Sequence, residues 1–255
     1  MIRQSRIITT TSGQFSPLEL NKDIQNILNK LNLNNNSIIC DVGCGIGKQV
    51  ELLRHTIKCN YYGLDFSPAT IEYLKDTNIF DKVYLCSSDI LPLPDKMCDV
   101  AISMENLEHL YEEPVLNAIK ELLRISNYVI ITTPRPDICM FMKWINKELD
   151  EAINDMIPLS EHDYICLESC VHKSTIYPNS MNKCGFDMYW NGISMIYHGK
   201  SSEINLDFLE YTGINKQQHY AKYSTLKDRY VNLLKECKNI NDEILYKFSC
   251  TPFKI

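Results

Sequence analysis

Three glycines at alternate positions, with acidic residues before and after them, form the part of this chain best suited to bind a nucleoside. Gly43, Gly45 and Gly47 follow an apolar run, and Asp41 lies near the end of that run. Glycine has no Cβ, so the backbone of such a turn can approach a ligand closely. Asp65 follows Gly47 at nearly the ~20-residue offset of an acid that accepts hydrogen bonds from ribose hydroxyls. The spacing predicts a nucleoside site; the alternative is that the glycines form an ordinary loop.

The same stretch departs from two common phosphate-binding motifs. Lys48 occupies the position at which the dinucleotide fingerprint requires glycine or alanine. A P-loop requires Ser or Thr after Gly-Lys, and here Gln49 follows Gly47 and Lys48. The ligand is therefore predicted to carry a nucleoside without a pyrophosphate.

Five apolar runs are predicted to be the strands that position this site. They cover residues 38–42, 60–65, 82–87, 98–104 and 128–133. Runs of this kind are typical of parallel strands buried on both faces of a sheet. Ligands of such sheets lie beyond the carboxyl ends of the strands, so the glycine turn, Asp65, Asp89 and the loop that begins at Glu105 are expected at one edge.

Helix start signals separate these strands. Ser16 and Ser67 each stand as an N-cap before a proline at the first helical position. A further helix follows Gly47, and Glu112 and Glu113 place negative charge at the positive end of another. Alternating strands and helices predict an α/β fold.

The pattern after residue 136 is less regular. It predicts a helix over 138–153, a loop-rich cover over 155–176, a short helix after Tyr177 and Pro178, and a strand over 187–196. Further helical material is expected over 199–241 and a closing strand over 244–255. Because no repeat or linker is evident, we expect one domain over residues 1–255.

Composition narrows the class of protein. The chain has 255 residues, 45% hydrophobic content and a formal net charge of −6, which disfavours broad nucleic-acid binding. No run approaches the ~20 apolar residues of a membrane span, and polar residues after Arg6 predict no secretory signal. The 11 cysteines predict reduced thiols and a cytoplasmic protein.

One stretch contains several potential metal ligands, namely His162, Cys166, Cys170, His172 and Cys184. Structural zinc sites use two arms of closely paired ligands. Only Cys166 and Cys170 have that spacing, so buried thiols and ordinary histidines are the preferred interpretation and no metal is predicted.

An ordered set of blocks resembles the class I S-adenosylmethionine-dependent methyltransferases. The blocks are Asp41–Gly47, Gly63–Ser67, Ser88–Ile90, Leu93–Asp95, Cys98–Met104, Leu107–Leu110, Glu121–Arg124 and Tyr128–Pro134. The resemblance implies a Rossmann-like, doubly wound, mostly parallel seven-stranded sheet with an antiparallel closing strand and helical substrate-covering insertions. It divides the domain into an N-terminal cap helix (1–36), a cofactor-binding core (37–135) and a substrate-covering part with the last two strands (136–255).

The resemblance also implies S-adenosylmethionine as the cofactor and assigns residues to it. The glycines would approach its methionine portion, Asp41 its amino group and Asp65 its ribose hydroxyls. Phe66, Asp89 and Ile90 would surround the adenine, and Met104 would lie near the sulfonium; for Asp89, a purely turn-forming role is the alternative. The full implied set is Asp41, Gly43, Cys44, Gly45, Gly47, Asp65, Phe66, Ser88, Asp89, Ile90, Met104 and Glu105.

The predicted function is methyl transfer from S-adenosylmethionine to a small molecule by O-methylation. Sugars, sugar nucleotides, quinone-like lipids and specialised metabolites are the candidate acceptors, and a homodimer is an option. Candidate general bases are His109, His162 and His172, because the ordinary pKa of histidine lies near working pH. The alternatives are an RNA or protein methyltransferase, or a catalytically silent cofactor-binding partner subunit.

Overall fold

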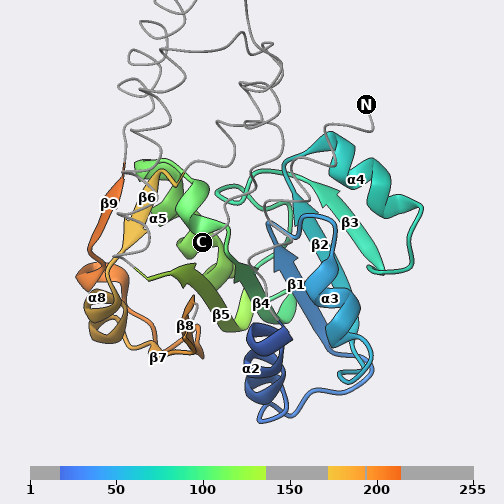
Figure 1. The fold of residues 1–255 in the computed structure, drawn as a ribbon, viewed down its shortest axis with the longest axis horizontal. Coiled ribbons are helices and arrows are strands. Elements are labelled where there is room, and N and C mark those ends of the chain that lie inside the picture. Colours follow the sequence, from blue (N-terminus) through green and yellow to red (C-terminus); the bar gives the residue numbers. More distant parts are fainter. Residues whose placement is uncertain (1–17, 136–171, 193, 214–255) are drawn as a thin grey trace, which may run out of the picture.

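Seven strands form one sheet in the computed structural model, which describes residues 18–135, 172–192 and 194–213 (Figure 1). The strands are β1 Ile38–Val42, β2 Asn60–Asp65, β3 Lys82–Leu85, β4 Cys98–Met104, β5 Ser126–Pro134, β7 Asp187–Trp190 and β8 Ser194–Lys200. Their order is β3-β2-β1-β4-β5-β8-β7, and only β8 runs against the others. The predicted fold class, a mostly parallel seven-stranded sheet with one antiparallel strand, is confirmed.

The antiparallel part corrects one prediction. The strand expected over 187–196 is two strands, because the chain reverses after Asn191 and Gly192. Gly192 has a φ of +97°, and the Ser194 N–H donates to Asn191 Oδ1 at 2.9 Å. Asn-Gly is a strong hairpin signal for this reason. The antiparallel strand is therefore β8, whereas the strand predicted over 244–255 lies outside the described residues.

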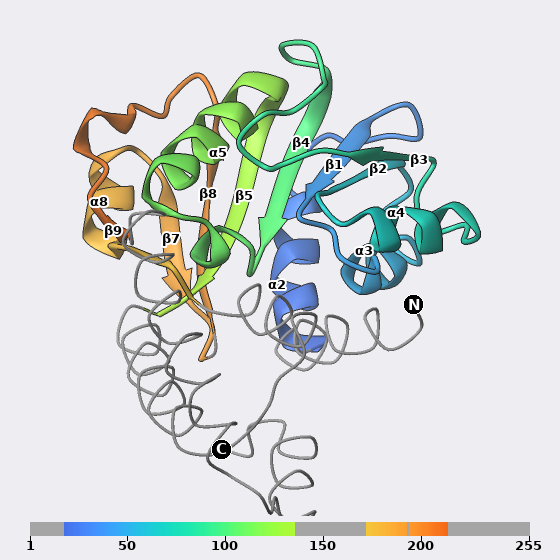
Figure 2. The same ribbon diagram turned by 90° about the horizontal axis from the view of Figure 1, so that it is seen from above.

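Helices cover both faces of the sheet (Figure 2). They are α2 Leu18–Leu28, α3 Lys48–Leu53, α4 Pro68–Lys75, α5 Glu112–Ile125 and α8 Pro178–Lys183. One core cluster joins α2, α3 and α4 to side chains such as Ile39 and Val100, and the other joins α5 and α8 to Cys40 and Ala101. Adjacent strand residues point to opposite faces, so β1 and β4 are buried on both sides, as their apolar runs predict.

A second, two-stranded sheet was not predicted. It pairs β6 Ser174–Ile176 with β9 Tyr211–Gly213, in segments expected to be loop and helix. Three-residue strands carry too little periodicity to be recognised in a sequence. Two short 3₁₀ helices, η1 Leu107–His109 and η2 Leu206–Phe208, complete the described elements. Ser174 Oγ donates to the Leu107 carbonyl at 2.9 Å, and this contact attaches β6 to η1.

Arg124, in the last turn of α5, attaches the segment after β3 to this helix. Its guanidinium donates to the Leu91 and Leu93 carbonyls at 3.1 and 2.7 Å and pairs with Glu121 and Asp95. These contacts hold the segment that follows β3 against α5, and so position the loop that contains the predicted adenine contacts.

Several predictions fall outside the described residues or stay untested. The helix over 138–153 is outside them, and the division into 1–36, 37–135 and 136–255 stays a prediction. Within the described part of the chain, no helix is both long enough and apolar enough to cross a bilayer.

Candidate cofactor and active site

The glycine turn after β1 is hydrogen-bonded to the end of β2. The N–H groups of Gly43 and Cys44 both donate to the Leu64 carbonyl, at 2.8 and 3.1 Å. Gly43, Gly45 and Gly47 have φ values of +76°, +50° and +78°. These values lie in the left-handed region, which favours glycine, so the alternate glycines are required by the shape of the turn.

The three glycines differ in their surroundings. A Cβ on Gly43 would lie 2.3 Å from the Asn106 Cγ, and one on Gly47 would lie 2.7 Å from Ile79 and Phe80. A Cβ on Gly45 would meet no described atom within 4 Å. Gly43 and Gly47 are therefore needed for packing, while Gly45 leaves open space beside the turn.

Asp65 joins the end of β2 to this turn. Its Oδ2 accepts the Gly45 N–H at 2.9 Å, and its Oδ1 accepts the Ser67 N–H at 2.9 Å. The side chain is only 7% exposed. Burial raises the pKa of Asp65, and the backbone hydrogen bonds partly offset that shift because they favour the charged form. The predicted ribose-binding acid and the predicted glycine turn thus lie in direct contact.

Asp41 adds a second buried acid behind the turn. Its side chain is 2% exposed, and burial raises its pKa to about 8, with a further contribution from the charge of Asp65. The same burial and the two carboxylates raise the pKa of the Cys44 thiol. Cys44 therefore stays a thiol near neutral pH, and the acidic pair would favour a positively charged group in this place.

Two large apolar side chains are exposed at the same edge of the sheet. Phe66, just after β2, is 65% exposed, and Ile90, after β3, is 73% exposed. Exposed apolar side chains at the carboxyl edge of parallel strands provide surfaces on which a planar ring can pack. Asp89, which precedes Ile90, accepts a hydrogen bond from the Ser87 hydroxyl.

Asn106 connects three loops of the site and was not predicted. Its Nδ2 donates to Ser88 Oγ and Ser103 Oγ, both at 3.1 Å, and its side chain fills the space above Gly43. It thereby links the ends of β1, β3 and β4. No local pattern marks such a residue, because its partners are distant in the sequence.

Glu105 directly follows Met104 at the end of β4 and has a φ of +49°. Its N–H donates to the Thr132 carbonyl at 3.0 Å. Burial raises the pKa of the Glu105 carboxyl, although hydrogen bonds with Ser194 and Thr132 act in the opposite direction. Non-glycine residues with positive φ are uncommon and often occur at functional sites.

Two of the three predicted bases come together beside Glu108. His109 Nε2 lies 3.8 Å from Glu108 Oε1, and the rings of His109 and His172 meet edge to face with centroids 5.1 Å apart. The Glu108 side chain is 2% exposed, and burial together with the charge of Glu105 raises its pKa. The Lys173 N–H donates to the Glu108 carbonyl at 2.6 Å, which brings His172 to this place.

The other members of the cysteine–histidine stretch do not share this cluster as far as the structure describes them. Cys184 is buried in the hydrophobic core below α5 and α8. His162, Cys166 and Cys170 lie outside the described residues. Glu108, which the sequence analysis noted only within a resemblance block, is the residue that His109 and His172 have in common.

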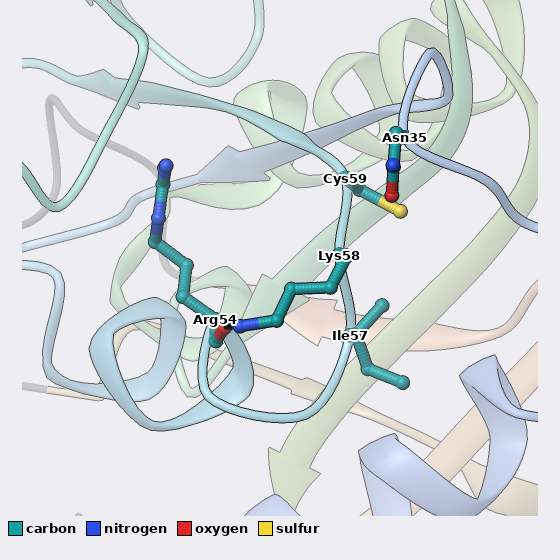
Figure 3. A pocket seen from close by; sticks show the side chains of 5 residues that line it. All are labelled: Asn35, Arg54, Ile57, Lys58 and Cys59. Atoms are coloured by element: carbon teal, nitrogen blue, oxygen red, sulfur yellow. Dashed lines mark hydrogen bonds between the residues drawn. The ribbon is translucent and has the colours of Figure 1, made fainter.

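A separate hollow of about 340 Å³ lies at the other end of the sheet (Figure 3). Asn35 and Cys59, which line it, precede β1 and β2, and Arg54, Ile57 and Lys58 complete its wall. Arg54 is paired with Asp81 at 3.0 Å. This hollow is at the amino ends of the strands and contains none of the predicted site residues.

Comparison with known proteins identifies the domain. The family model described as a methyltransferase domain matches residues 40–131, which span the glycine turn, Asp65, β4 and most of β5. The chain contains a class I S-adenosylmethionine-dependent methyltransferase domain. Its cofactor is S-adenosylmethionine, so the resemblance predicted from the sequence is confirmed.

Individual relatives match the methyltransferase domain over part of their length. The chain is 32% identical over 115 residues to the tRNA (carboxymethyluridine(34)-5-O)-methyltransferase of Arabidopsis thaliana, covering 42% of this chain and 27% of that protein. It is 28% identical over 126 residues to a protein of Oryza sativa subsp. japonica named probable tocopherol O-methyltransferase, chloroplastic, covering 47% and 32%. The match thus spans less than a third of the length of these curated relatives.

Solved structures include similar methyltransferase chains. The magnesium protoporphyrin IX methyltransferase of Synechocystis PCC 6803 with bound S-adenosylhomocysteine aligns with a TM-score of 0.44 and 16% identity, over 76% of this chain and 84% of that chain.

Proposed function

We propose that this protein transfers a methyl group from S-adenosylmethionine to an acceptor hydroxyl. The observation that carries the proposal is the contact between Asp65 and the Gly45 N–H, because it brings the ribose-binding acid and the open side of the glycine turn into one site. The nucleoside and the methionine portion of one cofactor can then lie across the ends of β1 and β2.

Within this proposal, each predicted cofactor residue has a role that suits its surroundings. Asp41 interacts with the positively charged amino group of the cofactor, and Asp65 accepts hydrogen bonds from the ribose hydroxyls. Phe66 and Ile90 pack against the adenine. The remaining predicted contacts are Gly43, Cys44, Gly45, Gly47, Ser88, Asp89, Met104 and Glu105.

The reaction needs alignment more than it needs a reactive side chain. The acceptor oxygen attacks the methyl carbon, the carbon–sulfur bond breaks, and sulfur keeps the electron pair, so that S-adenosylhomocysteine is released. Positioning of this kind can contribute ~7–11 kcal/mol. The hydroxyl proton must leave, and His109 and His172 are the described candidates to take it, which adds typically 10²–10⁴-fold. His162 stays a candidate from the sequence.

Two considerations support oxygen as the accepting atom. Both curated relatives carry names of O-methyltransferases, and a carboxylate–histidine cluster at the end of β4 suits removal of a hydroxyl proton. The acceptor that we propose is a small molecule. The net charge of −6 favours it over a nucleic acid, whereas the tRNA methyltransferase among the relatives makes an RNA acceptor the second candidate.

The six described cysteines are free thiols, which supports a cytoplasmic location, and a homodimer stays an option.

A transfer assay with methyl-labelled cofactor tests the proposal. The purified chain would be incubated with metabolite extract, total RNA or total protein, and the label followed in each fraction. Label in a small-molecule product that resists mild base as an ether supports the proposal. Label only in RNA supports the second candidate. No transfer to any fraction, despite binding of S-adenosylhomocysteine, supports the silent subunit and contradicts the proposal.

A further inference from the structure

The cluster at the end of β4 contains more ligand atoms than a general base requires. One atom each from Glu108, His109 and His172 lies within 4.8 Å of the other two. Ligand atoms bound to one metal ion at about 2.1 Å lie about 3–4 Å apart. An inward shift of about 1 Å would therefore let the three side chains share a single ion.

Two buried carboxylates in this place have oxygen atoms without a hydrogen-bond partner among the described residues. They are Oε2 of Glu108 and Oε1 of Glu105. Glu105 lies close enough for its charge to act on Glu108. A buried carboxylate oxygen that accepts no hydrogen bond is costly, and each such group calls for a bound ion or water. A cation bound by Glu108 would satisfy the unpaired oxygen of that side chain.

The alternative, a Glu–His dyad that acts as a base, fits the geometry less well. The distance of 3.8 Å between His109 Nε2 and Glu108 Oε1 exceeds that of a hydrogen bond. The carboxylate therefore does not orient the His109 ring through a proton. A second imidazole, that of His172, lies against the first and offers a further ligand nitrogen, for which a dyad has no use.

We propose that Glu108, His109 and His172, with Glu105 beside them, bind one divalent cation. A set of carboxylates and imidazoles suits Mn²⁺, Fe²⁺, Co²⁺ or Zn²⁺. Sequence spacing alone predicted no metal, because these ligands come from two separate segments. If the proposed function holds, such a cation would lower the pKa of the acceptor hydroxyl, and the proton would pass to solvent water. The two histidines would then act as ligands rather than as the bases named above.

Metal binding can be tested without turnover. The purified full chain, stripped with EDTA and returned to chelator-free buffer, would be titrated with Mn²⁺ while the paramagnetic resonance signal of the free ion is recorded. We expect one site per chain. His172→Ala and the near-isosteric Glu108→Gln should each weaken Mn²⁺ binding at least tenfold, and His55→Ala, at an exposed histidine before β2, should not change it.

The outcomes separate this proposal from the proposed function. S-adenosylhomocysteine binding, measured by calorimetry on the metal-free chain, reports on the cofactor site alone. No binding of Mn²⁺, Zn²⁺ or Mg²⁺ at millimolar concentration would overturn the cation site while leaving the cofactor site intact. Equal Mn²⁺ affinity in the wild type, His172→Ala and Glu108→Gln would overturn it as well, because the ion would then be bound elsewhere.

Discussion

Replacing Asp65 with asparagine tests the cofactor site at the contact on which it depends. A carboxylate offers about four acceptor positions. In this structure the Gly45 and Ser67 N–H groups occupy two of them, at 2.9 Å each. The remaining positions are available to the hydroxyls of one ribose. Asparagine keeps the shape and half of the acceptors, because its carbonyl oxygen accepts hydrogen bonds and its NH₂ group only donates them.

The expected loss can be estimated from these contacts. A hydrogen bond to a charged group contributes about 1.5–3 kcal/mol, and each 1.4 kcal/mol is a tenfold change in affinity. The loss of one ribose hydrogen bond should therefore weaken S-adenosylhomocysteine binding by about 10- to 150-fold. One backbone N–H also loses its acceptor, so the free energy of unfolding should fall by about 1–3 kcal/mol.

Calorimetric titration of S-adenosylhomocysteine into Asp65→Asn would measure the affinity, with urea unfolding to establish that the variant is folded. Asp81→Asn is the matched control, because the Asp81 carboxylate also accepts a backbone N–H, from Tyr61 at 2.7 Å, but at the opposite end of β2. A folded Asp65→Asn with an affinity within about threefold of the wild type would refute the assignment to the ribose. Equal losses in both variants would show a general effect on the sheet.

Three further predictions concern the glycine turn and the acid behind it. Gly47→Ala should lower the free energy of unfolding by about 2–4 kcal/mol in urea unfolding, through left-handed strain and overpacking. Gly45→Ala should lower it by only about 1–2 kcal/mol but weaken cofactor binding. A larger loss of stability in Gly45→Ala than in Gly47→Ala would contradict the open space beside Gly45. Gly43→Ala should cost less stability in an Asn106→Ala background than alone, because the clashing side chain is gone; strictly additive losses would argue against that contact. Burial raises the pKa of Asp41 to about 8, far above its unfolded value, so the acid is protonated at pH 7. Because the unfolded chain loses this proton near pH 4 and the folded chain near pH 8, the free energy of unfolding should fall by about 1.4 kcal/mol per pH unit between about pH 4 and 8 and level off above. Binding of a positively charged amino group should therefore release a proton at pH 7, seen by calorimetry in buffers of different ionisation enthalpy, and Asp41→Asn should abolish the release.

The core of the fold could be predicted because its signals are local. The runs at β1, β2 and β4 are apolar throughout, since parallel strands are buried on both faces, and Ser67 caps α4 as its position before Pro68 indicates. Predictions failed where the signal was short or interrupted. The Asn191–Gly192 turn divides what was taken as one strand, and β6 and β9 have three residues each.

By itself, the sequence determined the chemistry of the cofactor edge, because the glycine turn and Asp65 lie at the ends of consecutive strands whose order a parallel α/β unit dictates. Only the tertiary structure decided which distant side chains meet there. Asn106 reaches Gly43 because β4 lies beside β1, and His172 reaches Glu108 because β6 is attached to η1. Such contacts depend on the packing of segments far apart in the chain, and no local spacing encodes them.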